Sequence, residues 1–215
     1  MLKVKICGIT TLKQACQIEK LGADALGFIF YEKSPRYISP QDARKISKKL
    51  GPFIKKIGVF VNEDKWTVLE MLSYCNLDFA QLHGEETVEY CDYIGKEKVI
   101  KVFRIPANLK KEDFEYYLNK IKPYEKVVQA ILIDTKKEKF YGGTGEETNW
   151  DFVKFLIENI KVSVILSGGI GLDNIERAKK IKNLYGVDAN SKLEVKPGIK
   201  DLEKVERFIL KAKCK

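Results

Sequence analysis

Apolar and polar positions follow two patterns that alternate along the whole chain. Short apolar runs rich in valine and isoleucine predict strands, and the segments between them carry apolar residues at helical spacing. The predicted strands are residues 4–6, 25–30, 56–61, 79–82, 99–103, 127–133, 162–166 and 184–187. The predicted helices are residues 12–21, 40–50, 64–74, 85–93, 111–120, 150–159, 172–181 and 201–213.

This alternation of strand and helix predicts the fold. Eight such units in 215 residues favour a closed (β/α)8 TIM barrel with parallel strands over an open doubly wound sheet. No linker rich in glycine, serine or proline interrupts the pattern, so we expect a single domain over residues 1–215. In such a barrel the loops after the strands share one face and carry the function. The residues that follow each predicted strand are therefore the candidates for chemistry.

The first candidate is Cys7, which directly follows the strand at residues 4–6. Gly8 lets the chain turn there, and Thr10 or Thr11 can cap the next helix. A thiolate can act as a base where positive surroundings lower the pKa of the thiol. The alternative is a small core residue, because free cysteines are often buried.

The second candidate is Asp134, at the end of the apolar run 130–133. Burial there disfavours the charged form of a carboxyl group, which suits a general acid near neutral pH. An aspartate that only caps a turn is the alternative. The loop that follows contains Gly142, Gly143 and Gly145, and it is typical of a lid that closes over a substrate, although a merely floppy loop fits too.

The ends of strands seven and eight predict an anion site. Gly168 and Gly169 precede a helix, and Asn190 and Ser191 follow strand eight. Backbone N–H groups in such loops suit a phosphate, and the loops after strands seven and eight often bind one in barrels. A Gly-Gly pair that makes only a tight turn is the alternative.

Two further side chains follow strands. Arg36 lies after strand two, and its planar fork suits a carboxylate, although for Arg36 taken alone a surface arginine held by Pro35 is the stronger interpretation. His83, the single histidine, follows strand four and can carry charge near neutral pH, unless a backbone hydrogen bond merely holds it there. The sequence does not decide whether Arg104 contacts a substrate.

The composition of the chain limits the binding partners that we expect. Five cysteines without Cys-x-x-Cys spacing and one histidine match no usual zinc pattern, so we expect no metal. No signal peptide and no membrane-spanning apolar run is visible, so we expect a cytoplasmic protein without a membrane partner. The net charge of +9 makes nucleic acid binding an alternative. The basic residues are scattered among 30 acidic ones, however, so we expect no nucleic acid partner.

Several short motifs follow one another along the chain. They are Lys5-Ile6-Cys7-Gly8-Ile9-Thr10, Ser34-Pro35-Arg36-Tyr37, Gln81-Leu82-His83-Gly84, Asp134 with Gly142-Gly143-Thr144-Gly145 and Trp150, Ser167-Gly168-Gly169, and Asn190-Ser191 with Pro197-Gly198-Ile199-Lys200-Asp201. In this order, the motifs resemble the phosphoribosylanthranilate isomerase family of tryptophan biosynthesis. The resemblance spans nearly the whole chain, and it departs at Lys192, where the family usually has glycine.

The resemblance implies an Amadori rearrangement of N-(5-phosphoribosyl)anthranilate to 1-(2-carboxyphenylamino)-1-deoxyribulose 5-phosphate, without cofactor or metal. By analogy, Asp134 protonates the ring oxygen and Cys7 takes the proton from the sugar C2. Arg36 would hold the anthranilate carboxylate, and the backbone of Gly168, Gly169 and Ser191 the phosphate. The substrate-binding residues expected in all are Arg36, His83, Gly143, Gly168, Gly169, Asn190 and Ser191.

Other interpretations remain. One is another phosphate-binding barrel. An indole-glycerol-phosphate synthase would need a lysine acid and a glutamate at strand ends, and a pentose-phosphate epimerase would need histidine metal ligands. A basic nucleic-acid-binding module belongs to a different class. An inactive scaffold is a third interpretation, against which Cys7 and Asp134 count. The exposed strand-end loops could also pair two barrels as a homodimer.

Overall fold

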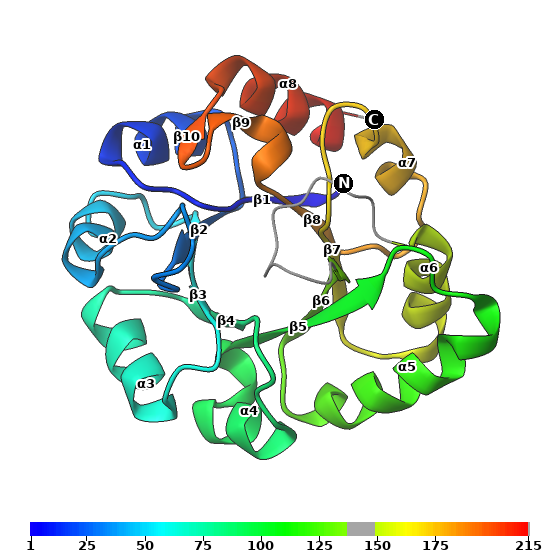
Figure 1. Cartoon of the computed structure of the whole chain (residues 1–215). Coiled ribbons are helices and arrows are strands. Elements are labelled where there is room, and N and C mark those ends of the chain that lie inside the picture. Colours follow the sequence, from blue (N-terminus) through cyan, green and yellow to red (C-terminus); the bar gives the residue numbers. More distant parts are fainter. Residues whose placement is uncertain (137–148, 215) are drawn as a thin grey trace.

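Eight parallel strands close into a barrel in the order of the sequence, with helices around it (Figure 1). The computed structural model describes residues 1–136 and 149–214. The strands are β1 Lys3–Ile6, β2 Ala25–Ile29, β3 Lys55–Phe60, β4 Phe79–Leu82, β5 Val99–Pro106, β6 Ala130–Lys136, β7 Ser163–Leu166 and β8 Gly186–Ala189. Because β8 also pairs with β1, each of these strands has two neighbours, as the predicted TIM barrel requires.

The helices occur where the apolar spacing predicts them, but several ends differ. They are α1 Leu12–Lys20, α2 Pro40–Ser47, α3 Lys65–Tyr74, α4 Val88–Ile94, α5 Phe114–Ile121, α6 Trp150–Asn159, α7 Ile175–Lys179 and α8 Leu202–Lys213. Of the two predicted caps for α1, Thr11 is the one used. α4 starts later than predicted because Thr87 caps it, and α7 starts later than predicted because it follows a turn in which Asn174 accepts from the N–H of Gly171.

Alternation along the strands separates inward from outward side chains, and the inward ones form two halves along the barrel axis. Successive side chains of a strand point to opposite faces, so Val4 and Ile6 join the outer core while Lys5 points inward. The half near the strand starts is mostly apolar, although Lys5 also lines the cavity there, and more polar side chains enter nearer the strand ends. The apolar cluster, which forms a floor beneath them, contains Ala25, Ile57, Ile100, Val102, Ala130, Leu132 and Ile165.

Two strand ends differ from the prediction in a way that matters for the site. β6 continues to Lys136 because β5 runs on to Pro106 and pairs with it. Asp134 therefore lies within a strand, opposite Arg104, and its backbone is held by the ladder. β8 likewise contains Asp188, which pairs in register with Lys5 of β1.

A small hairpin after β8 is absent from the sequence-based assignment. A short 3₁₀ helix, η4 Ser191–Leu193, leads into β9 Glu194–Lys196 and β10 Ile199–Lys200. Gly198 turns the chain with φ +82°, a conformation that favours glycine. The Thr10 hydroxyl donates to the carbonyl oxygen of Gly198 at 2.7 Å, which ties the hairpin to the loop after β1.

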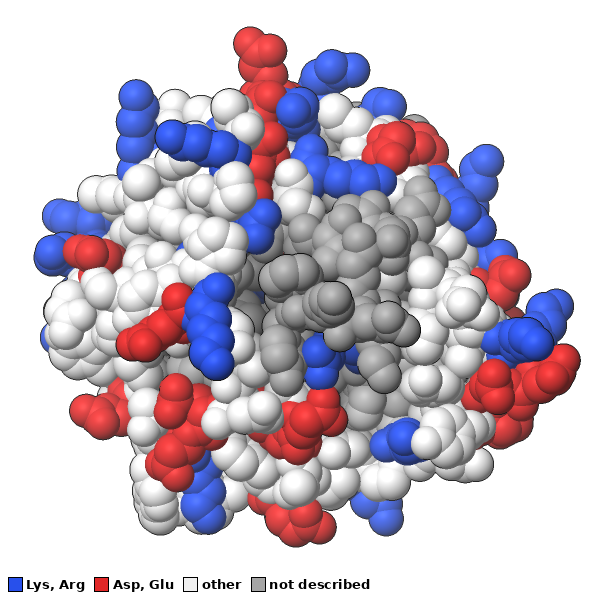
Figure 2. Space-filling view, viewed as in Figure 1, with Lys and Arg blue, Asp and Glu red and all other residues white. Residues whose placement is uncertain are grey.

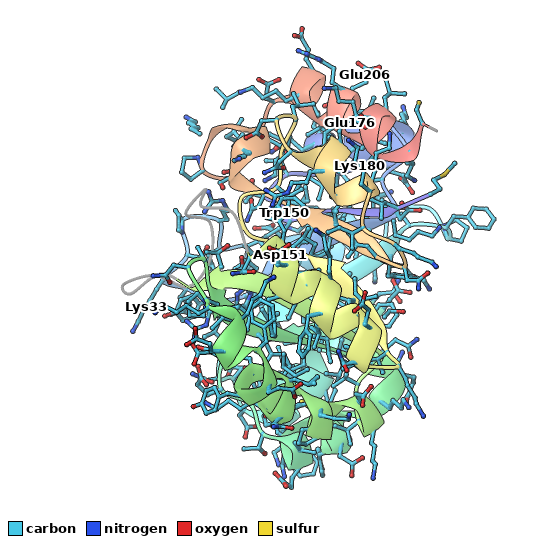
Figure 3. All side chains as sticks on the ribbon, turned by 90° about the vertical axis from the view of Figure 1, so that its right-hand side faces the viewer. Lys33, Trp150, Asp151, Glu176, Lys180 and Glu206 are labelled. Atoms are coloured by element: carbon cyan, nitrogen blue, oxygen red, sulfur yellow. The ribbon has the colours of Figure 1, made fainter. Side chains whose placement is uncertain are left out.

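Charged side chains of both signs surround the barrel opening. Figure 2 shows lysines and arginines among aspartates and glutamates around this face. Viewed from the side, α6, α7 and α8 cover one wall, where Trp150, Glu176 and Glu206 mark the three helices (Figure 3). Within the described ranges, no helix is long and apolar enough to cross a membrane.

The close approach of β8 to β1 can be tested with Gly186→Ala. A β-carbon at position 186 would lie 2.7 Å from the backbone oxygen of Lys3, so the two strands would have to move apart. We expect urea denaturation to show a loss of about 1–3 kcal/mol in unfolding free energy, as for other overpacked sites.

The control is Ser163→Ala, at the start of the neighbouring β7, which should stay within about 0.5 kcal/mol of the parent chain. Equal midpoints for Gly186→Ala and the parent would contradict the argument from close packing.

Candidate active site

A cavity opens among the carboxyl ends of the strands. Five residues predicted from the sequence line it: Cys7, Arg36, His83, Asp134 and Asn190. Asp188 and Gln81, to which the sequence analysis gave no role, line it as well. The fold thus gathers residues from β1, β4, β6 and β8 and from the loop after β2 into one space.

Cys7 is held at the end of β1 by its backbone. Its N–H donates to the carbonyl oxygen of Ala189 at 2.9 Å, and Gly8 then turns the chain with φ +76°. The side chain is buried, with 5% of the residue exposed. Burial raises the pKa of the Cys7 thiol, while the ammonium groups of Lys5 and Lys200 oppose this shift. The Cys7 thiol is therefore buried inside the barrel and lines the cavity.

A buried ion pair lies beside this thiol. The Lys5 ammonium is 2.8 Å from Oδ2 of Asp188, and both side chains are almost fully buried. Burial works against the charge of Lys5, but Asp188 and Cys7 outweigh it and raise the pKa of the ammonium. The other carboxylate oxygen, Oδ1 of Asp188, has no hydrogen-bond partner in the described part of the chain.

Asp134 and His83 face each other across the cavity. Oδ2 of Asp134 lies 3.2 Å from Nε2 of His83, and its Oδ1 accepts from the backbone N–H of Thr135 at 2.8 Å. The opposite ring nitrogen, Nδ1, is 3.5 Å from the amide nitrogen of Gln81. An imidazole beside a carboxylate can share a proton with it, so the pair is suited to proton transfer.

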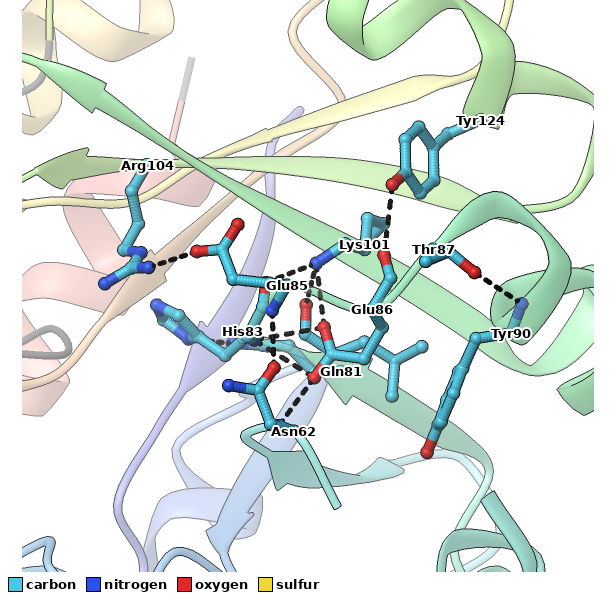
Figure 4. A network of polar contacts seen from close by, with 12 residues as sticks. Asn62, Gln81, His83, Glu85, Glu86, Thr87, Tyr90, Lys101, Arg104 and Tyr124 are labelled. Atoms are coloured by element: carbon cyan, nitrogen blue, oxygen red, sulfur yellow. Dashed lines mark hydrogen bonds and ion pairs between the residues drawn. The ribbon is translucent and has the colours of Figure 1, made fainter. Parts of the chain in front are cut away.

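A polar network fixes the loop that carries His83 (Figure 4). The buried Lys101 ammonium lies 2.8 Å from Oε2 of Glu86 and donates to the carbonyl oxygens of Leu82 and Gly84. Glu86 accepts in turn from the backbone N–H groups of Gly84 and Asn62. The backbone is thus held on both sides of His83, which limits where the imidazole can point.

Arg36 is held by a carboxylate from the hairpin after β8. Its Nε and Nη2 donate to Glu194, with Nη2 2.7 Å from Oε2. Lys200, whose side chain is fully buried, lies 2.8 Å from Oε1 of Glu194 and 2.7 Å from Oδ1 of Asn190. Burial alone would raise the pKa of Glu194, but Arg36 and Lys200 outweigh it and hold that pKa below its usual value.

The predicted anion site occupies two neighbouring loops. Gly168 and Gly169 both adopt positive φ, +83° and +66°, which favours glycine at each position. In the described part of the chain, neither N–H donates to another backbone group. Asn174 fixes this loop through the carbonyl oxygen of Gly169. Ser191 opens η4 in the loop after β8.

Lys192 joins these two loops. Its ammonium lies 2.7 Å from Oδ2 of Asp173, and its methylene groups pack against Gly171. The backbone at position 192 is part of a 3₁₀ helix, outside the left-handed region, so lysine stands there without the strain that replaces a positive-φ glycine.

Gly143 and the predicted lid at 142–145 lie outside the described residues. The described ranges contain no cluster of three or more side chains suited to a metal ion.

A family model described as N-(5'phosphoribosyl)anthranilate (PRA) isomerase matches residues 4–211. The chain belongs to this family. It is 43% identical over 214 residues to the isomerase of Geobacter metallireducens, with 100% of both chains covered. The family resemblance seen in the sequence is thereby confirmed, and the chain is an isomerase.

Solved structures of the isomerase family share this barrel over their whole length. One is a complex with reduced 1-(o-carboxyphenylamino)-1-deoxyribulose 5-phosphate, with a TM-score of 0.83, 39% identity and 99% of each chain covered. Another shows monomers generated from the dimeric isomerase of Thermotoga maritima, with a TM-score of 0.83, 38% identity and again 99% of each chain covered.

The sequence analysis missed four charged residues of this isomerase: Lys5, Asp188, Glu194 and Lys200. A signal existed for Lys5, because a lysine between Val4 and Ile6 occupies an inward position of a strand. Lys200 stands in one of the family motifs, but neither it nor Glu194 carried such a positional signal, because the hairpin that contains them was not predicted. These four residues supply much of the charge around the predicted ones.

Glu194→Gln tests the charge network around Arg36. Loss of the carboxylate leaves Lys200 buried without its ionic partner, so we expect a loss of about 3 kcal/mol in unfolding free energy at pH 7. The pKa of Glu194 is lower in the folded chain than in the unfolded one. Its contribution is therefore full above about pH 4.3 and lost as the pH falls through the folded-state value.

Denaturation of both proteins between pH 3 and 8 should show the difference shrinking toward acid. Glu206→Gln, on the exposed side of α8 (Figure 3), is the control and should match the parent chain. A difference that is the same at every pH would contradict the ionic explanation.

Proposed function

We propose that this isomerase converts N-(5'-phosphoribosyl)anthranilate into 1-(o-carboxyphenylamino)-1-deoxyribulose 5-phosphate, with Cys7 as the base and Asp134 as the acid. The proposal rests above all on one observation: the two side chains line the same cavity. The solved relative with 39% identity holds a reduced form of this product. One acid and one base in a single cavity are what the movement of one proton along a sugar requires.

The acid acts first. Asp134 gives its proton to the ring oxygen as the bond between that oxygen and C1 breaks, and the anilino nitrogen supplies electrons to form a C1–N double bond. His83, 3.2 Å from the carboxylate, is placed to return a proton to Asp134. The product of this step is an open-chain Schiff base.

The base acts second. The Cys7 thiolate takes the proton from C2, and the electrons of the C–H bond form a C1–C2 double bond while the C1–N double bond becomes single. This enamine then gains a proton at C1 and loses one from the C2 hydroxyl, which yields the ketone. The number of protons on the substrate is unchanged, so no redox partner is needed.

The two charged ends of the substrate would bind on either side of these groups. Glu194 engages Nε and Nη2 of Arg36, which orients the guanidinium fork beside the cavity, and we assign the anthranilate carboxylate to it. We assign the phosphate to the N–H groups of Gly168, Gly169 and Ser191. The remaining expected ligands, His83, Asn190 and Gly143, stay predictions.

Cys7→Ala and Asp134→Asn test these roles. Each removes one proton-transfer group, so we expect kcat to fall at least about 10²-fold while the folded structure persists. Loss of the substrate's fluorescence measures the rate, and circular dichroism checks the fold.

Cys16→Ala and Asp92→Asn, which lie on helices away from the cavity, are the matched controls and should keep full activity. Near-normal kcat in Cys7→Ala or in Asp134→Asn would remove that residue from the mechanism.

We also infer that two barrels pair through the face opposite the active site. Phe53, just before β3, is 95% exposed. It borders a second cavity at the strand starts, where Ala25, Ile57 and Phe79 contribute apolar surface. In a twofold dimer the Phe53 of each copy can fill the cavity of the other. The Thermotoga maritima relative is described as dimeric.

Phe53→Asp should convert this dimer into a monomer, because it removes the ring that fills the cavity and places a carboxylate against the apolar part of its lining, Ala25, Ile57 and Phe79. Light scattering after gel filtration measures the mass. Leu210→Asp, at an exposed apolar position of α8, is the control and should stay dimeric. A parent chain that elutes as a monomer at micromolar concentration would overturn the inference.

A further inference from the structure

Lys5 is a charged side chain in the barrel interior to which the proposed reaction gives no role. Only 4% of the residue is exposed, and its ammonium lies 2.8 Å from Oδ2 of Asp188. The two residues are paired in register where β8 closes against β1. Burying an ion pair costs solvation, and apolar residues of similar size often stabilise a fold equally well. A purely structural role is therefore a weak explanation for this lysine.

Gly27 of β2 shows that the ammonium and the Cys7 thiol converge on one point. A β-carbon at position 27 would lie 2.6 Å from Sγ of Cys7 and 3.0 Å from Nζ of Lys5. Gly27 is not among the described glycines with positive φ, so its backbone conformation does not require glycine. What requires glycine is the space that the thiol and the ammonium share.

The charges that face Cys7 come from three strands. Lys5 of β1 and Lys200 of β10 favour its thiolate form, and Asp188 of β8 disfavours it. Burial also disfavours the thiolate by raising the pKa of the thiol. His83 and Asp134 act on Asp188 from across the cavity. Of the two cations, Lys5 is the one that shares the small space beside Gly27 with the thiol.

We propose that Lys5 is a positioning residue for the base: its ammonium, anchored on Asp188, lies beside the Cys7 sulfur and stabilises the thiolate that takes the proton from the substrate C2. This proposal rests on the proposed function and deepens it. The thiol proton leaves to solvent before catalysis. When Cys7 takes the C2 proton, Lys5 keeps its own protons and its ion pair with Asp188. Lys5 itself never exchanges a proton with the substrate.

The test measures the Cys7 thiol without turnover. Iodoacetamide alkylates the thiolate form, and mass spectrometry of the Cys7 peptide separates it from the other cysteines. Rates between pH 6 and 11 give a midpoint for the parent chain, for Lys5→Met and for Gly27→Ala. We expect the Lys5→Met midpoint to rise by at least about one pH unit, which is about tenfold slower alkylation below it.

Lys3→Met is the matched control. It removes a lysine from the same strand, two residues earlier, where the side chain is 57% exposed and paired with Asp24. Its Cys7 midpoint should equal that of the parent chain. Gly27→Ala keeps every charge but separates the thiol from the ammonium, so its midpoint should rise as well. If circular dichroism shows that Lys5→Met does not fold, the alkylation midpoint of Gly27→Ala alone tests the proposal.

Activity adds a second readout. The kcat/KM of Lys5→Met should recover as the pH rises and the thiolate forms, whereas a purely structural defect would lower it equally at every pH. Parent-like alkylation midpoints in both Lys5→Met and Gly27→Ala would overturn the proposal. Failure of the proposed function shows up separately, as an active Cys7→Ala variant.

Discussion

The pairing of β8 with β1 is the contact on which the rest of the site depends. It closes the barrel and joins residues from the two ends of the chain, so that Lys5 meets Asp188 across 183 positions of sequence. The same seam holds the Cys7 backbone through the carbonyl oxygen of Ala189. The two strands can approach closely because Gly186 has no side chain and leaves room for the backbone of Lys3. Without this register, Cys7 would have neither its position nor its charged neighbours.

Buried charge pairs hold the loops on two sides of the cavity. On one side, Lys101 and Glu86 fix the backbone around His83. On the other, Glu194 binds both Arg36 and Lys200. Such pairs add little net stability, but breaking one leaves an unpaired buried charge, so the loops have few alternative conformations. A cavity that must orient a substrate with two anionic ends benefits from walls that do not rearrange.

The polar half of the barrel interior lies at the face with the proposed chemistry, and the apolar half lies at the face with the proposed self-association. Alternation points both Leu132 and Asp134 of β6 inward, and their positions along the strand place Leu132 in the floor and Asp134 in the cavity above it. The apolar floor lowers the local dielectric constant beneath the site, which strengthens the electrostatic contacts above it. The same apolar half opens at the strand starts, where Phe53 lies exposed. Chemistry and the proposed self-association can therefore use opposite ends without interfering.

The sequence by itself determined the barrel and the residues at its strand ends. Eight repeats of strand and helix are a local pattern, and a parallel barrel places every strand end on one face. The sequence alone therefore predicts that Cys7, His83 and Asp134 lie close together, and all three line one cavity. Only the tertiary structure decided which charges meet: Lys5 with Asp188, and Arg36 with Glu194, which is 158 positions away. Local periodicity says which face a residue occupies, but the neighbour of a buried charge depends on strand register and on loops folding back, which arise only when the barrel closes.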